Sequence, residues 1–360
     1  MVLIILGFSF SASAESAGAA ITIEAGSGTA LYSKNADTRR PMASTTKIMT
    51  ALVALEQKSL DSVFVVSKRA STVEGSQMGL LENDKISLRD LLYMLMLKSA
   101  NDAAEVIAEN ISGSNEKFAE LMNARAEKIG LKDTHFVNPH GLPDDNHYTT
   151  ARELALIARE ALKNSKFAEL VATKEIKISY HHMVLENSNR LLSSYAYANG
   201  VKTGFTKKAG RCLVSSATKD GVTLITVTLN DGNDWQDHKY LMDEGFKRVC
   251  LFEIYKPGEY CVTRPVLNGA EEAVYKNSES IYGVMIDGVK QKYEFTSNIS
   301  PVLYAPVTAG QKNGTVGVYS KGSLVCESPL CLQNNVMQKE EAASFIEKLF
   351  INFCKLVNRL

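Results

Sequence analysis

The sequence lacks an excess of charge of either sign. Lys and Arg together number 40, Asp and Glu also number 40, and the formal net charge is zero. A chain that binds a nucleic-acid backbone needs a concentration of basic residues, and no basic patch with interleaved aromatic residues occurs. Low-complexity blocks and internal repeats are also absent. With 360 residues, 45% of them hydrophobic, the composition predicts a globular protein of two domains and no nucleic-acid partner.

No metal-binding pattern occurs among the histidines and cysteines. The sequence contains neither HExxH nor CxxC, spacings that place two ligands on one ion. Three histidines, His135, His140 and His147, fall in one predicted loop, and His181 and His182 are adjacent. We interpret these side chains as hydrogen-bonding within their own loops, and we predict no metal and no cofactor.

The cysteines do not define a disulfide framework. Spacing leaves open a bridge between Cys326 and Cys331, a bridge between Cys250 and Cys261, and free thiols buried in the core. Six cysteines in a chain of this length are compatible with an exported protein but do not require one.

The first residues, "MVLIILGFSFSASAES", contain no hydrophobic run long enough to span a bilayer. The short apolar run before Ala12-Ser13-Ala14 is typical of a secretory signal peptide with its cleavage site, although the usual basic segment before the run is missing. The alternative is an apolar N-terminal strand. We expect a signal peptide at residues 1–14, a mature chain that begins near Glu15, and export.

Residues 15–252 are predicted to form one α+β domain. Two alternating apolar runs around residues 26–28 indicate a hairpin, and a loop is expected over 133–148, where proline and glycine interrupt the pattern. Later strand patterns, "GVKTGFT", "RCLVSSAT" and "VTLITVTLN", precede the helical "WQDHKYLMDEGFKRV". This order predicts an antiparallel sheet with helices packed on it. The other predicted helices are "IMTALVALEQ", "SLRDLLYMLMLK", "DAAEVIAENI", "NEKFAELMNARAEKIG" and "TARELALIAREALK".

The remainder of the chain changes character twice. Residues 253–336 show short β runs with glycine turns and predict a small all-β domain. Residues 337–360 return to helical periodicity, with an apolar face opposite Lys, Glu and Asn. A helix of this kind packs on a core or lies in a membrane interface, and its place after a complete domain favours the interface. The predicted apolar face consists of Ala342, Phe345, Ile346, Leu349, Phe350, Phe353, Leu356, Val357 and Leu360.

Three short polar motifs carry the candidate chemistry. We call them triplets, although the first consists of the pair Ser44 and Lys47. Ser44 and Lys47, in "MASTTKIMT", have the spacing that places two side chains on one helix face. At a helix start the backbone N–H groups favour negative charge, and a lysine in a dry pocket near another cation can act as a base. Ser44 could equally be a simple N-cap. The other triplets are Ser99-Ala100-Asn101, between two predicted helices, and Lys202-Thr203-Gly204, followed by Phe205 in a predicted strand.

Each triplet taken alone has an ordinary structural explanation, but SxxK, SxN and KTG in this order are typical of penicillin-binding proteins and serine β-lactamases. The sequence resembles the serine-type D-Ala-D-Ala carboxypeptidases, the low-molecular-mass penicillin-binding proteins. The resemblance covers nearly the whole chain, including the segments "FVNPHGL", "HYTTARELA", "NSNRLL" and "VKTGFTKKAGRCLVSSA". It implies a penicillin-binding, β-lactamase-like transpeptidase domain, a small all-β domain and an amphipathic helix.

The resemblance also implies roles for individual residues. Ser44 attacks the peptide bond between two D-alanines, Lys47 is the general base, and Ser99 relays a proton to the leaving amine. Asn101 orients substrate and Lys47, Lys202 polarises the site, and Thr203 binds the terminal carboxylate. Gly204 allows a close backbone approach, and the N–H groups of Ser44 and Phe205 hold the oxyanion. The implied partners are the peptidoglycan stem peptide, β-lactam antibiotics and the outer face of the cell membrane.

The chain departs from the resemblance at two positions. Ser188 stands where some relatives carry an arginine in the Asn-x-Asn segment. A second arginine, which helps to hold the substrate carboxylate in some relatives, aligns near Asp234. We therefore expect carboxylate recognition to depend more on Lys202 and Thr203.

Two rival functions remain. A class A β-lactamase uses a glutamate between the second and third motifs, whereas "LKDTHFVNPHGLPDDNHYTT" contains no glutamate. A catalytically weak wall-binding or scaffold protein would have no need for a nucleophile and base. We therefore favour a peptidase.

Overall fold

The structure is a computed structural model that describes residues 16–339 and 345–357. The predicted signal peptide lies outside the described residues, as do residues 340–344 and 358–360 of the tail. The chain divides into two compact units, Met1–Leu251 with Val284–Val289 and Phe252–Gly283 with Lys290–Leu360.

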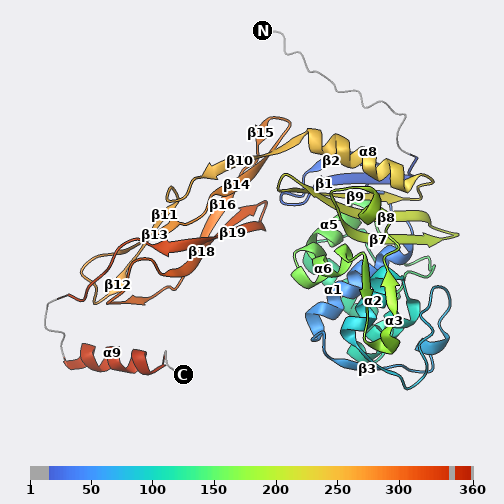
Figure 1. The fold of residues 1–360 in the computed structure, drawn as a ribbon, viewed down its shortest axis with the longest axis horizontal. Helices are drawn as coiled ribbons and strands as arrows, with labels where there is room; N and C mark the ends of the chain where they lie inside the picture. Colours follow the sequence, from blue (N-terminus) through green and yellow to red (C-terminus); the bar gives the residue numbers. More distant parts are fainter. Residues whose placement is uncertain (1–15, 340–344, 358–360) are drawn as a thin grey trace, which may run out of the picture. The chain divides into compact units, whose positions relative to one another are not determined.

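A five-stranded antiparallel sheet organises the first unit. Its strand order is β2-β1-β9-β8-β7, and the predicted hairpin β1–β2 is confirmed. One face of the sheet packs against α8 (Asp234–Lys247), and α5 packs against the other (Figure 1). Strand β7 is an edge strand, so its outer edge is available to a ligand. The strands are β1 (Ala19–Glu24), β2 (Ala30–Lys34), β7 (Ala198–Thr206), β8 (Gly210–Lys219) and β9 (Val222–Leu229).

Helix boundaries follow from local side-chain chemistry. The Ser87, Ser114 and Thr150 side chains accept hydrogen bonds from backbone N–H groups and cap α2, α4 and α5. Gly113 and Gly130 end α3 and α4 in the left-handed conformation that glycine adopts without strain. The α-helices of this layer are α1 (Lys47–Gln57), α2 (Leu88–Leu97), α3 (Asn101–Ser112), α4 (Asn115–Ile129), α5 (Ala151–Leu162), α6 (Ser165–Ala172) and α7 (Leu191–Ser194), and the 3₁₀ helices are η1 (Ala43–Thr46), η2 (Ala70–Thr72) and η3 (Tyr180–His182).

The short strand pairs were not predicted. Strands β3 (Val63–Val65) and β4 (Lys85–Ser87) form one pair, and β5 (Glu175–Lys177) and β6 (Val184–Glu186) form another. Each strand has three residues, which is too short for an alternating pattern to stand out.

Helix α1 runs through the centre of the first unit. Its residues from Lys47 to Ala54 are all buried, and its apolar side chains belong to one core cluster shared with α2, α3, α5 and the sheet. A helix that is apolar around its whole circumference is held on every side. The Ser44–Lys47 segment is therefore fixed by the packing of the helix that follows it.

The second unit contains the predicted small all-β domain, which has its own core. Its main sheet has the order β11-β13-β19-β18-β16, and β12 pairs with β17 in parallel. Tyr275, Val316, Val318 and Leu330 are fully buried within it. A three-stranded sheet, β10-β14-β15, has its residues divided between the units. The strands are β10 (Val249–Tyr255), β11 (Cys261–Arg264), β12 (Val266–Leu267), β13 (Ala273–Asn277), β14 (Ile281–Ile286), β15 (Val289–Lys290), β16 (Glu294–Ile299), β17 (Leu303–Tyr304), β18 (Lys312–Ser320) and β19 (Ser323–Leu332).

All six cysteines are free thiols, and only Cys212 is buried. Cys326 and Cys331 lie on the same strand, β19, where five residues at about 3.3 Å each keep them too far apart to bridge.

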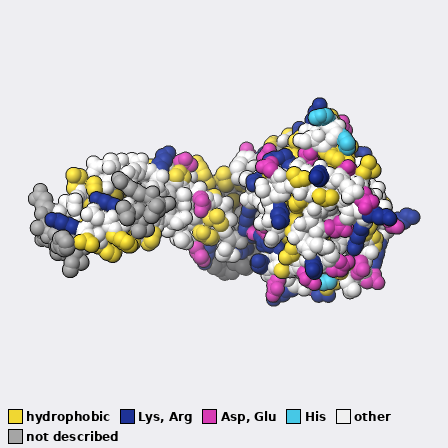
Figure 2. Space-filling view, turned by 90° about the horizontal axis from the view of Figure 1, so that it is seen from below, with side chains coloured by type: hydrophobic (Ala, Val, Ile, Leu, Met, Phe, Trp, Pro, Cys, Tyr) yellow, Lys and Arg dark blue, Asp and Glu magenta, His cyan; other side chains and the backbone are white. Residues whose placement is uncertain are grey.

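The tail forms helix α9 (Phe345–Val357). Leu349, Phe350 and Phe353 are 58–64% exposed. Within the described residues, no helix combines the length and apolarity needed to cross a membrane. On the face of the first unit shown in Figure 2, basic and acidic side chains are interspersed.

Candidate active site

Ser44 lies in η1, immediately before α1. Neither helical segment has a side-chain capping bond at its start, so Ser44 does not act as an N-cap. Its hydroxyl instead accepts a hydrogen bond from Lys47 Nζ at 3.1 Å. The neighbouring hydroxyls of Thr45 and Thr46 bond back to the Met42 and Ala43 carbonyls.

Lys47 is fully buried and has three oxygen neighbours. Besides Ser44 Oγ, its Nζ donates to Asn101 Oδ1 at 2.8 Å and to the His140 carbonyl oxygen at 2.7 Å. The Asn101 side-chain orientation is set independently, because its Nδ2 donates to the Glu74 carbonyl at 2.6 Å. Two of the three partners can only accept. A neutral Lys47 amine would give its two N–H groups to these acceptors and direct its lone pair at the Ser44 hydroxyl.

The electrostatics favour this neutral form. Burial, followed by the nearby Lys202 charge, lowers the pKa of Lys47 well below its usual range, and Asp102 opposes the shift only in part. Burial also lowers the pKa of Lys202 to about 7. Two cations in one dry region repel each other, and the more crowded one loses its proton first.

Strand β7 brings the third triplet to the helix start. Lys202 is buried, and its Nζ donates to the Thr203 carbonyl at 2.8 Å and lies 3.5 Å from Thr203 Oγ1. A Cβ on Gly204 would lie 3.0 Å from the Ser44 backbone nitrogen, so the strand passes close to η1. Phe205 is 65% exposed at the next position.

The second triplet lies at the α2–α3 junction. Asn101 is the first residue of α3, and its backbone N–H donates to the Ser76 carbonyl at 2.7 Å. Ser99 has a positive φ of 61°, and its hydroxyl has no hydrogen-bond partner among the described residues. Ser99 lines the same cavity as Ser44 but, unlike Asn101, is not bonded to Lys47.

A cavity of about 520 Å³ unites these groups in the first unit. Its walls contain members of all three triplets together with residues that sequence reasoning had not assigned to the site. The lining residues are Ser44, Ser76, Ser99, Ser188, Arg190, Thr203, Gly204, Phe205, Arg211, Asp234 and Trp235.

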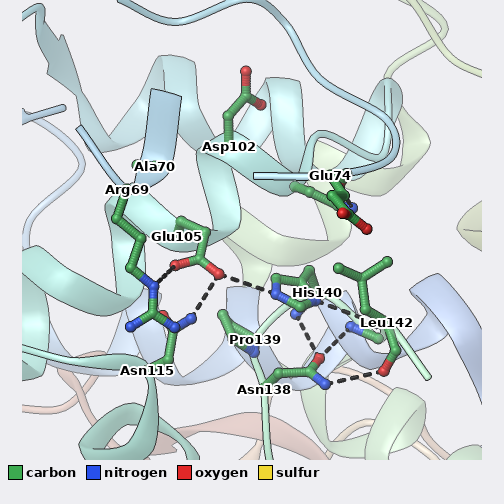
Figure 3. A network of polar contacts seen from close by, with 12 residues as sticks. Arg69, Ala70, Glu74, Asp102, Glu105, Asn115, Asn138, Pro139, His140 and Leu142 are labelled. Carbon is green, nitrogen blue, oxygen red and sulfur yellow. Dashed lines mark hydrogen bonds and ion pairs between the residues drawn. The ribbon is translucent and has the colours of Figure 1, made fainter. Parts of the chain in front are cut away.

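The loop that supplies the His140 carbonyl is anchored by a buried network (Figure 3). His140 Nε2 lies 3.0 Å from Glu105 Oε1, which also accepts from Asn115 Nδ2 at 2.6 Å. Because His140 Nδ1 accepts from the Leu142 N–H at 3.2 Å, its Nε2 carries the proton and donates to Glu105. Arg69 Nε lies 3.4 Å from Glu105 Oε2.

The network holds its carboxylate ionised and its imidazole neutral. Burial alone would raise the pKa of Glu105, but hydrogen bonds from His140 and Asn115 and the charge of Arg69 hold it below its usual value. Burial lowers the pKa of His140 despite the opposing bond to Glu105. A neutral His140 with a fixed tautomer keeps its backbone carbonyl in place against Lys47.

The interpretation of the loop histidines as bonded within their own loop is correct for His135, whose Nδ1 bonds to the Asn146 carbonyl. It is also correct for His140, whose Nδ1 accepts from the Leu142 N–H, and for His147, whose Nδ1 accepts from the Val137 N–H at 3.1 Å. The second ring nitrogen of each bonds outside the loop, His140 Nε2 to Glu105 and His147 Nε2 to Thr46 Oγ1 at 2.7 Å. These contacts span long stretches of sequence and carry no local pattern. Among the described residues, no three His, Cys, Asp or Glu side chains are arranged to hold a metal ion.

Sequence reasoning also missed Glu105 and Arg211. Glu105 occupies a helical position where a glutamate is usually solvent-exposed, and only its burial reveals a role. Arg211 is the second residue of β8, a strand whose alternating pattern drew attention to its apolar residues.

A serine and a buried lysine one turn apart, beside an edge strand that carries Lys-Thr-Gly, define the class of penicillin-binding serine enzymes with a transpeptidase-like fold. Comparison with known families agrees with this class. The chain belongs to the D-alanyl-D-alanine carboxypeptidase family, whose profile matches residues 7–233. Residues 251–338 match the C-terminal domain of penicillin-binding protein 5.

Individual relatives extend over most of the chain. D-alanyl-D-alanine carboxypeptidase DacF of Bacillus subtilis is 30% identical over 95% of this chain and 91% of its own length. DacC of Escherichia coli is 32% identical over 88% of this chain and 83% of its own. The crystal structure of penicillin-binding protein 5 from Haemophilus influenzae, 27% identical, covers 92% of this chain and all of its own with a TM-score of 0.66.

Proposed function

We propose that this chain is a serine D-alanyl-D-alanine carboxypeptidase that removes the terminal D-Ala from peptidoglycan stem pentapeptides. The observation that carries the proposal is the contact between Lys47 Nζ and Ser44 Oγ at 3.1 Å, made by a buried lysine whose other two partners are acceptors. A carboxypeptidase needs this nucleophile and base, whereas a wall-binding protein does not.

Acylation starts with proton transfer from Ser44 Oγ to the neutral Lys47 amine. The Ser44 oxygen forms a bond to the carbonyl carbon between the two D-alanines, and the N–H groups of Ser44 and Phe205 stabilise the resulting oxyanion. The C–N bond then breaks. The departing D-Ala amine takes up the proton held by Lys47, with Ser99 as the relay.

Substrate binding falls to residues of the second and third triplets. Thr203 binds the terminal carboxylate, Lys202 supplies positive charge near it, and Asn101 orients the peptide backbone and Lys47. Gly204 keeps strand β7 close to η1, where a Cβ would meet the Ser44 nitrogen at 3.0 Å.

The acyl-enzyme is resolved by water. A water molecule gives a proton to Lys47 and attacks the ester carbonyl, and Ser44 Oγ leaves and regains its proton. A β-lactam forms the same serine ester but blocks the path of water with its attached leaving group, which makes it a covalent inhibitor. A β-lactamase role is not favoured, since the cavity walls described above contain no glutamate.

Location forms part of the same proposal. We infer that residues 1–14 direct export, that residues 15–252 are the catalytic domain and that residues 253–336 are a separate β domain. Residues 337–360 then hold the enzyme on the outer face of the cell membrane. The exposed Leu349, Phe350 and Phe353 of α9 support this interfacial role.

Two measurements on one preparation test the function, and the turnover of a chromogenic lactam serves as a third when they disagree. The first is mass spectrometry of the penicillin-treated protein, which should place one adduct on Ser44 and none on the Ser44→Ala variant. The second is D-Ala release from a pentapeptide ending in D-Ala-D-Ala. An adduct without peptide hydrolysis but with rapid turnover of a chromogenic lactam would replace the proposal with a β-lactamase. The absence of any adduct would favour a scaffold.

A further inference from the structure

The wall of the cavity contains an arginine, Arg211, that the mechanism above does not use. Arg211 lies on β8 directly opposite Phe205 of β7. In an antiparallel pair, opposed residues share a face of the sheet, and Thr203, two positions before Phe205, lies on the same face. Diagonal neighbours of this kind are about 7–8 Å apart, within reach of a long side chain. Thr203 and Arg211 therefore lie on the same face of the sheet, and both line the cavity.

Arg211 is held in place by Asp234. Its Nη2 donates to Asp234 Oδ1 at 2.6 Å and its Nε donates to Oδ2 at 3.1 Å, a two-point contact. The Asp234 side chain is 5% exposed, and its Oδ1 also accepts from the Trp235 N–H at 2.9 Å. Asp234 is the first residue of α8, where the helix end stabilises a negative charge. The guanidinium carbon lies 5.8 Å from the centre of the Trp235 ring.

This arrangement leaves one side of the guanidinium for a ligand. Arg211 Nη1 has no hydrogen-bond partner among the described residues, and the Arg211 side chain is 44% exposed. An arginine already fixed by two bonds loses little side-chain entropy when it binds an anion. Arg190, the other arginine of the cavity wall, is exposed and has no such anchor among the described residues.

We propose that Arg211 recognises the C-terminal carboxylate of the substrate together with Thr203, and that Asp234 is the positioning residue that holds Arg211. This inference rests on the proposed function, because a carboxylate next to the scissile bond is the mark of a carboxypeptidase substrate. It adds Arg211 to the expectation that carboxylate recognition depends more on Lys202 and Thr203. Lys202 is a weaker source of charge, since burial lowers its pKa to about 7.

The test pairs Arg211→Gln with Arg39→Gln. Arg39 is a matched control, because it bonds to Asp133 at 2.9 Å and lies 4.7 Å from the Tyr148 ring centre, yet is not part of the cavity wall. Each variant is tested with two pairs of probes, and the members of a pair differ only in the carboxylate. The first pair is a peptide that ends in D-Ala-D-Ala and the same peptide as its C-terminal amide. The second pair is benzylpenicillin and its methyl ester. The readouts are kcat/KM for the peptides and the acylation rate constant for the penicillins. Thermal unfolding of each variant verifies folding.

The expected loss for Arg211→Gln is roughly 10- to 100-fold with the acids, the value of a hydrogen bond to a charged group. The amide and the ester should change by less than about threefold, and Arg39→Gln should leave all four probes unchanged. Arg211→Lys keeps the charge without the two-point contact and should restore part of the loss. An equal loss with acid and neutral probes, or no loss with either, overturns the inference. If the wild type is acylated by penicillin but releases no D-Ala, the peptidase proposal fails, and the acid–ester comparison still decides the role of Arg211.

Discussion

The backbone carbonyl of His140 accepts a hydrogen bond from Lys47 Nζ at 2.7 Å. Lys47 and His140 are thereby joined through a backbone atom, while the His140 ring points the other way, to Glu105. The position of the base therefore depends on a carboxylate that never touches it. The chain Glu105–His140–Lys47 connects the buried network of Figure 3 to the nucleophile.

Glu105→Gln should therefore slow acylation without touching the reacting groups. An amide in place of the carboxylate removes the ion pair with Arg69. Its NH₂ group also faces a hydrogen-bond donor, since His140, Asn115 and Arg69 all donate to Glu105. Together these changes should lower the free energy of unfolding by about 1–3 kcal/mol. The His140 carbonyl then shifts, and we expect the rate of penicillin acylation to fall on the order of tenfold. Stopped-flow labelling well below the unfolding temperature measures this rate.

The control for that variant is Glu116→Gln. Glu116 lies 3.9 Å from the same arginine, Arg69, but its side chain is 71% exposed, so both rate and stability should stay close to wild type. A Glu105→Gln protein with a normal acylation rate and a lowered unfolding temperature would show that the network is only structural.

The three triplets could be predicted from sequence because their chemistry resides in side-chain type and order. Side-chain type and order alone were enough to select Ser44, Lys47, Asn101 and Lys202. The α+β domain with its antiparallel sheet followed from the alternation of apolar residues. Short elements such as β3 and β5 could not be predicted, since three residues carry no measurable period.

The remaining parts of the site depend on tertiary contacts. The role of His140 lies in a backbone carbonyl, which no side-chain pattern encodes. From sequence, Asp234 was interpreted as standing where some relatives carry a carboxylate-binding arginine. The structure pairs Asp234, on α8, with Arg211, which lies 23 positions earlier on strand β8. Such a pairing becomes visible only when β8 and α8 are placed side by side.

The pH dependence of acylation should have two limbs set by two lysines. Acylation needs neutral Lys47, whose pKa burial and Lys202 lower well below the usual range, so kcat/KM should rise with pH on the acidic side. Lys202 loses its charge above its pKa of about 7, so kcat/KM for an anionic substrate should fall on the basic side. Measurement of kcat/KM between about pH 4 and pH 10 reports both limbs.

Variants at position 202 separate the two limbs. Lys202→Arg keeps a permanent charge, so the basic limb should move to higher pH. Lys202→Gln removes a cation that depresses the pKa of Lys47, so the acidic limb should also move to higher pH. A profile that is the same in all three proteins would contradict the assignment of both limbs.

Stability should fall as the pH drops below neutral because His238, His147 and His140 are buried as neutral imidazoles. Burial lowers the pKa of His238, which is fully buried, from 6.5 to about 3, and the pKa of His147 to about 3. Between these values the unfolded state binds more protons, so the free energy of unfolding rises with pH in this window and decreases as the pH falls. Going from about pH 6.5 to about pH 5 should cost about 2 kcal/mol for each of His238 and His147.

Urea unfolding at the two pH values measures this slope. His238→Gln keeps a donor and an acceptor for Ser215 and Thr228, the present partners of the ring, and should remove the share of the pH dependence that one histidine contributes. His182→Gln, at an exposed position, should leave the slope unchanged. An unaltered slope in His238→Gln would show that His238 is protonated in the folded state.

Membrane association should depend on the apolar face of α9. Phe350→Glu replaces a side chain that is 59% exposed on this helix and should release the exported protein from anionic lipid vesicles, since a buried charge opposes insertion. Asn352→Glu adds the same charge at another exposed position of the same helix and should weaken sedimentation with vesicles far less. Equal sedimentation of both variants with wild type would exclude the interfacial role.

Gly204→Ala tests how closely strand β7 must approach the nucleophile. The new Cβ would lie 3.0 Å from Ser44 N and 3.1 Å from Thr45 N, and backbone atoms cannot rotate away as a side chain would. Either β7 or η1 must move by several tenths of an ångström, and we expect the acylation rate to fall by about tenfold or more, since a 1 Å misplacement costs about 100-fold. In Gly232→Ala the new Cβ meets no atom within 4 Å, so both acylation and stability should be preserved. A Gly204→Ala enzyme with wild-type acylation would mean that the Ser44 N–H is not held in place by strand β7, and the oxyanion assignment to Ser44 and Phe205 would have to be abandoned.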